Sequence, residues 1–221
     1  MSAFKLAAQM ATTEIEFDIQ FSEDKQLMIC HDPELSRYGY PGKEISTLTG
    51  AELQALDIGA WFEDGKFAGE RMLTLNELFK KFTTQFTYHL EIKTPAPGLA
   101  AAILDCINTH QLASRTFVTS FHFTALVEFA SLDSGIPLGW LVRDEAFTTE
   151  NIHRAAEAGF SQFCPLAREV TPKRVAEAHQ HITEVRAHSV KNKQDMMRVI
   201  ESSCNGLTLN WPDWLTHKDQ T

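Results

Sequence analysis

Polar and apolar residues alternate strictly along residues 14–21, a pattern that predicts a β-strand with two unlike faces. The apolar face is formed by Ile15, Phe17, Ile19 and Phe21. The opposite face carries three carboxylates and one amide, from Glu14, Glu16, Asp18 and Gln20. A second extended run, LMICH at residues 27–31, follows closely, and we assign it to an accessory hairpin.

Short β-rich runs alternate with helical patterns along the rest of the chain. Strands are expected at YHLEIK, TFVTSF, LGWLV, SQFC, EVRAHSV and GLTL. Helices are expected at residues 2–10, 98–110, 124–130, 149–158, 171–181 and 193–202, and after Thr74, where Glu77 completes a capping signature. This alternation predicts a parallel sheet with crossover helices.

The number of strands narrows the fold further. Without the accessory hairpin the chain offers seven barrel-type strands, whereas a closed (β/α)₈ barrel needs eight. We therefore predict one α/β domain over residues 1–221, a TIM (β/α)₈ barrel that lacks its first strand. The stretch at about residues 32–71 is rich in loops and is expected to be an insertion.

Composition and charge limit the possible partners. The net charge of −9 argues against nucleic acid or an anionic membrane surface as a partner. No apolar run approaches the ~18 residues of a membrane span, and the first residues do not resemble a secretory signal, so we expect no stable membrane anchor. The four cysteines are scattered without a C-x-x-C pair, which favours reduced thiols in the cytoplasm. The sequence leaves the oligomeric state open.

Carboxylates on two predicted strands suggest a metal site. If the apolar face of residues 14–19 packs on helices, Glu16 and Asp18 point into the barrel near the end of the strand where barrel enzymes keep their sites. Glu91 and Lys93 share one face of YHLEIK in the same way. Three carboxylates from two strands suit Mg²⁺ or Ca²⁺ better than Zn²⁺. The alternative is an acidic, solvated face of an antiparallel sheet.

Two further residues have a structural and a functional interpretation. His31 precedes Asp-Pro and is either a turn residue or a general acid or base. Lys93 is either a surface lysine or a point charge for a phosphate oxygen. Three aromatic residues of the insertion form either an apolar lip or the insertion's own small core: Trp61, Phe62 and Phe67.

Four segments together resemble one family in order and spacing. They are IEFDIQFSEDKQLMICHDPELSR, DIGAWFEDGKFAGERMLTLNELF, HLEIK and VTSFHFTAL. The chain resembles the glycerophosphodiester phosphodiesterases from about residue 3 to about residue 213. The resemblance implies a TIM barrel with a small insertion after the second barrel strand. It also implies metal-dependent hydrolysis of glycerophosphodiesters to glycerol 3-phosphate and an alcohol, in glycerophospholipid and glycerol metabolism.

The resemblance also implies roles for individual residues. Glu16, Asp18 and Glu91 would bind a divalent cation, Mg²⁺ or Ca²⁺. His31 would be one of two catalytic histidines. The small-molecule substrate would contact three residues, Lys93, Ser120 and Phe121.

The sequence departs from the family pattern at its beginning. The family opens on a strand with a His-Arg-Gly motif, which supplies the other catalytic histidine, and this motif is absent from residues 1–221. His122 and His188 are possible substitutes for it. This absence leaves open an inactive or binding-only pseudoenzyme. A related barrel phospholipase that acts on lysophospholipids is a separate alternative.

Overall fold

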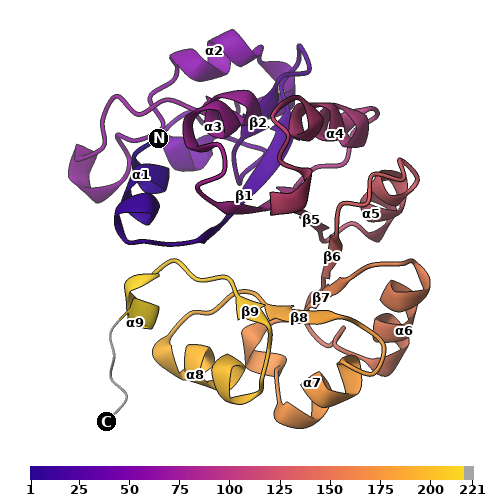
Figure 1. The fold of residues 1–221 in the computed structure, drawn as a ribbon. Helices are drawn as coiled ribbons and strands as arrows, with labels where there is room; N and C mark the ends of the chain where they lie inside the picture. The colour runs from indigo at the N-terminus through magenta and orange to yellow at the C-terminus, as the bar shows by residue number, and fades with distance from the viewer. Residues whose placement is uncertain (217–221) are drawn as a thin grey trace. The chain divides into compact units, whose positions relative to one another are not determined.

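The computed structural model describes residues 1–216, which divide into two compact units. The first unit comprises Met1–Thr116, and the second begins at Phe117. Figure 1 shows the first unit in indigo to magenta, and the second follows in orange to yellow. Both units alternate strands with helices, which confirms the predicted α/β class.

The sheet of the first unit is built around one strand, β1 (Glu14–Phe21). It pairs in parallel with β4 (Thr87–Ile92) and antiparallel with β2 (Leu27–Ile29), which in turn pairs with β3 (Leu73–Thr74). LMICH is thus an accessory hairpin strand, as predicted. The parallel register sets Asp18 directly opposite Glu91.

Helices cover the apolar face of this sheet. The helices of the first unit are α1 (Ser2–Gln9), α2 (Gly50–Ala55), α3 (Leu75–Phe82) and α4 (Leu99–Thr109). The predicted capping box at the start of α3 is present: the Glu77 amide donates to the Thr74 hydroxyl, and the Thr74 amide donates to the Glu77 carboxylate. The buried face of α3 reaches the sheet through Phe79, whose ring lies 4.9 Å from that of Tyr88.

The insertion after β2 has its own core, and its composition differs from the one we considered. Buried aliphatic and sulfur side chains form it: Met28, Cys30, Leu35, Ile45, Leu53 and Met72. Trp61 and Phe62 are 46% and 45% exposed, so the interpretation of these aromatics as the insertion's core is wrong. Their rings instead form a row on the surface, in edge contact at 5.4 Å.

The second unit continues the parallel pattern. Its strands β5 (Thr116–Ser120), β6 (Leu138–Leu141), β7 (Gln162–Cys164), β8 (Glu184–Ala187) and β9 (Gly206–Leu207) pair in chain order. The helices between and after them are α5 (Phe123–Ala130), α6 (Thr149–Glu157), α7 (Pro172–Ala178), α8 (Lys193–Glu201) and α9 (Asp213–Thr216). Helix α7 ends three residues earlier than predicted, because residues 179–181 form a turn. Within residues 1–216, no helix is both long and apolar enough to span a membrane.

Candidate active site

The first unit brings together the three carboxylates singled out in the sequence. Glu16 and Asp18 lie two residues apart on one face of β1, and Glu91 faces Asp18 from β4. One carboxylate oxygen from each of the three lies within 4.8 Å of the others. The parallel register explains this convergence, because the side chains of residues that lie opposite each other on adjacent strands point to the same face of the sheet.

Lys93 supplies positive charge to this carboxylate cluster. Its ammonium lies 3.1 Å from Asp18 Oδ1 and 3.1 Å from Glu91 Oε1. Burial disfavours the ammonium, but the charges of Asp18 and Glu91 outweigh that effect and raise the pKa of Lys93. One ammonium cannot balance three carboxylates, so the cluster retains a negative excess when all are ionised.

That excess is visible in the carboxyl pKa values. Burial, with repulsion from Asp18, raises the pKa of Glu91 to about 7, although Lys93 and the nearby His31 oppose the rise. Removal from water and repulsion by the charges of Asp18 and Glu91 raise the pKa of Glu16 to about 8. Because the Glu16 side chain is exposed at the surface, we regard repulsion as the firmer cause for this residue.

The donor set fits a hard divalent cation. Three carboxylates offer oxygen ligands alone, which Mg²⁺ and Ca²⁺ prefer. The buried Oδ1 of Asp18 faces the Lys93 ammonium at 3.1 Å. A divalent charge would balance the negative excess that this single ammonium leaves.

His31 lies two residues after the end of β2, close enough to Glu91 for its positive charge to lower the pKa of that carboxyl. Its Nδ1 is 2.6 Å from Asp32 Oδ1, and the other Asp32 oxygen pairs with Arg37 Nε at 2.8 Å. Because a carboxylate can only accept, this contact places the imidazole proton on Nδ1 and leaves Nε2 to exchange a proton with a substrate. The side chain is 54% exposed, so a substrate can reach it.

A buried glutamine, which the sequence interpretation did not assign a role, holds the backbone of His31. Gln20 continues the polar face of β1 after Asp18 and is 2% exposed. Its Nε2 donates to the carbonyls of Cys30 at 2.8 Å and His31 at 3.5 Å, while its Oε1 accepts from the Thr94 hydroxyl at 2.9 Å. The sequence did contain a signal for this position, because Gln20 continues the polar face of the alternating pattern that includes Glu16 and Asp18.

Ser120 and Phe121 lie in the second unit, at the carboxyl end of β5. Ser120 is fully buried, and its hydroxyl accepts from the His122 amide at 3.0 Å. The Phe121 ring lies 4.4 Å from the Arg143 guanidinium and 5.2 Å from the His188 ring. Arg143 lies two residues after the end of β6. The sequence interpretation did not single it out as a neighbour of Phe121, because one arginine after a strand forms no motif.

His188 and His122, which the sequence offered as possible substitutes for the missing histidine, both lie in this unit. The buried imidazole of His188 donates from Nε2 to the Val142 carbonyl at 3.0 Å, and its Nδ1 lies 3.0 Å from the Ser189 hydroxyl. Both ring nitrogens therefore have partners inside the protein. His122 occupies the N-cap position of α5.

Comparison with known proteins identifies the family. Residues 1–214 match the glycerophosphoryl diester phosphodiesterase family. The chain belongs to this family. A glycerophosphodiester phosphodiesterase of Caldanaerobacter subterraneus subsp. tengcongensis is 26% identical over 219 residues, which cover 97% of this chain and 89% of the relative. Another, from Bacillus subtilis, is 24% identical and covers 98% of this chain and 79% of the relative.

Solved structures of other phosphodiesterases share the fold. An Oleispira antarctica phosphodiesterase, solved with its product sn-glycerol-3-phosphate, matches with a TM-score of 0.86 and 22% identity over 96% of this chain and 86% of that chain. A Galdieria sulphuraria structure, described as a putative glycerophosphodiester phosphodiesterase, matches with a TM-score of 0.85 and 19% identity over 97% of this chain and 89% of that chain. The predicted fold class, the TIM barrel of this hydrolase family, is thereby confirmed.

Proposed function

We propose that this chain hydrolyses glycerophosphodiesters to glycerol 3-phosphate and an alcohol, with a divalent cation held by Glu16, Asp18 and Glu91. The observation that carries the proposal is the carboxylate cluster, in which three oxygens lie within 4.8 Å of one another beside one ammonium. Membership of the glycerophosphoryl diester phosphodiesterase family supplies the reaction. Its place in glycerophospholipid and glycerol metabolism and its location in the cytoplasm remain predictions.

Each residue of the site has a defined task in this proposal. A divalent cation bound at the cluster would polarise the phosphoryl oxygens and lower the pKa of a nucleophilic hydroxyl. Lys93 places a positive charge beside the carboxylates, where it would bind a phosphate oxygen of the diester. His31 exchanges a proton at Nε2, because Asp32 holds the proton on Nδ1. That Ser120 and Phe121 contact the substrate stays a prediction.

The test is hydrolysis of glycerophosphocholine after complete chelation and readdition of Mg²⁺ or Ca²⁺. Glu91→Gln removes one charged ligand and should lower the cation-dependent rate by at least 10²-fold. Asp105→Asn is the matched control, since Asp105 is an exposed carboxylate on α4. Cation binding without product release by the unaltered chain would favour the binding-only alternative. Full activity of Glu91→Gln would refute the assigned ligand set.

A second candidate, hydrolysis of lysophospholipids, is favoured by the exposed aromatics of the insertion. Trp61 and Phe62 expose about half of their surface in a row that continues to Tyr38 at 5.8 Å and Phe67 at 5.8 Å. Such a row offers an apolar surface to an acyl chain. Lysophosphatidylcholine should then be cleaved faster than glycerophosphocholine, and the double variant Trp61→Ala/Phe62→Ala should abolish that preference. Equal or slower cleavage of the lysolipid by the unaltered chain excludes this candidate.

A further inference from the structure

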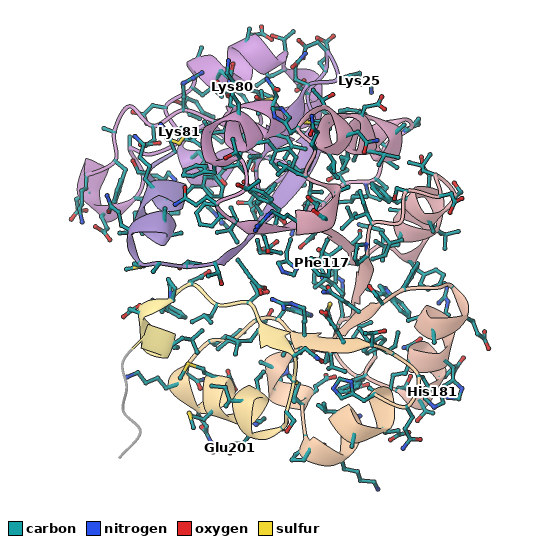
Figure 2. The ribbon with its side chains drawn as sticks, in the orientation of Figure 1. Lys25, Lys80, Lys81, Phe117, His181 and Glu201 are labelled. Carbon is teal, nitrogen blue, oxygen red and sulfur yellow. The ribbon has the colours of Figure 1, made fainter. Side chains whose placement is uncertain are left out.

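Two histidine side chains from neighbouring elements of the second unit meet at its surface. His153 lies in α6, and His181 lies in the turn that follows α7, where Figure 2 labels it. Their Nε2 atoms are 3.1 Å apart, and their ring centroids are 4.2 Å apart with planes at 67°. Both side chains are exposed, so solvent reaches the space around the two nitrogens.

The backbone holds both histidines in place. Ile152 and Ala155, which flank His153 in α6, are 2% and 0% exposed. The amides of His181 and Ile182 both donate to the Ala178 carbonyl, at 3.0 and 2.9 Å. Ile182 is itself 4% exposed and anchors the turn. The two imidazoles therefore extend from fixed positions, so a ligand that joins them would not need to order the backbone.

The same two helices touch again one turn earlier. The Thr149 hydroxyl donates to the Glu177 carboxylate, four residues before His153 and four residues before His181. This contact holds the start of α6 against the last turn of α7, and His153 lies one helical turn after Thr149 on the same face of α6. Helix packing, rather than one side-chain rotamer, thus brings the histidines together.

The separation of the nitrogens matches what a shared metal ion requires. With bonds of about 2.05 Å, two imidazole nitrogens lie about 2.9 Å apart at a right angle and about 3.3 Å apart at the tetrahedral angle. The observed 3.1 Å falls between these values. We propose that His153 and His181 form a surface site for a transition-metal ion, Zn²⁺, Cu²⁺ or Ni²⁺, which joins α6 to the turn that follows α7.

The ligand chemistry separates this histidine pair from the carboxylate cluster. Imidazole nitrogen prefers Zn²⁺, Cu²⁺ and Ni²⁺, whereas carboxylates alone prefer Mg²⁺ and Ca²⁺. Because both rings are exposed, water can fill the remaining positions around the ion. Without an ion, one neutral ring would donate an N–H···N hydrogen bond to the other, and an ion must displace that proton.

The test is a calorimetric titration of the full chain with Zn²⁺ at pH 7.5, in millimolar Mg²⁺ to occupy oxygen ligands. We expect one binding event that His153→Gln and His181→Gln each weaken by at least tenfold. His179→Gln, which alters an exposed histidine two residues away, should bind as the unaltered chain does. In ¹⁵N spectra of the imidazoles, Zn²⁺ should shift Nε2 of His153 and His181 together.

Two results would overturn the proposal. One is unchanged Zn²⁺ affinity in both His153→Gln and His181→Gln, with folding verified by circular dichroism. The other is an imidazole spectrum in which neither Nε2 responds to Zn²⁺ at saturation. Because neither measurement depends on diester hydrolysis, the outcome is independent of the proposed function.

Discussion

Replacing Gln20 with leucine should impair catalysis without removing any group that touches substrate. The leucine side chain is similar in size but can neither donate to the carbonyls of Cys30 and His31 nor accept from Thr94. In the unaltered chain these hydrogen bonds tie the end of β1 to the segment that carries His31. We therefore regard Gln20 as a positioning residue for the imidazole.

The size of the effect follows from these contacts. The bonds to Cys30 and Thr94, at 2.8 and 2.9 Å, are of normal length, whereas the bond to His31 at 3.5 Å is weak. Loss of two good hydrogen bonds, with a buried carbonyl left without its donor, costs about 2–3 kcal/mol of stability. For a chain of this size, that loss lowers Tm by about 4–12 °C.

The catalytic effect should exceed what lost stability explains. A displacement of His31 by about 1 Å is expected to lower kcat by roughly 10²-fold, with KM for glycerophosphocholine little changed. Tyr88→Phe is the matched control, because the buried Tyr88 hydroxyl donates to the Thr83 carbonyl at 2.6 Å in the same unit. Steady-state kinetics at 20 °C, where both variants are folded, compare the two. If Gln20→Leu has the same kcat as Tyr88→Phe, Gln20 does not position His31 for catalysis.

Three further predictions concern the titration of the carboxylate cluster, the cap of α3 and two buried thiols. In chelated protein, the free energy of unfolding should fall as the pH rises from about 5 to 8, because Glu91 and Glu16, with pKa values of about 7 and about 8, keep protons that the unfolded chain has already lost. Glu91 alone should contribute on the order of 3 kcal/mol to this fall. Urea unfolding across this range should show the slope, and Glu91→Gln should reduce it. Thr74→Ala breaks the capping box with Glu77 and should lower the free energy of unfolding by about 1 kcal/mol in the same urea assay. An unchanged urea midpoint would show that the cap does not stabilise the protein. Burial raises the pKa of the Cys30 and Cys164 thiols to about 11 and about 12, so both should resist a thiol reagent at pH 8 until urea unfolds the chain, and rapid native labelling of either would contradict their burial.

The alternation in residues 14–21 was sufficient to predict the strand, its two faces and the candidate ligands on one of them. The helix capped by Thr74 could be predicted for a similar reason, since the capping box is a local sequence signal. Periodicity and caps act within a few residues, so they can be identified without knowing what packs against the chain. The aromatics of the insertion were harder to interpret, because Trp61 would suit a small core and a surface equally well.

Sequence alone thus determined the α/β pattern, the family resemblance and the identity of the carboxylates at the candidate site. Only the tertiary structure decided which groups meet: Asp18 beside Glu91, Gln20 under the backbone of His31, and His153 against His181. These contacts join residues from 11 to 73 positions apart, and their distances depend on strand register and helix packing. Neither quantity is encoded in a local pattern, because each is set by the combined burial of many side chains.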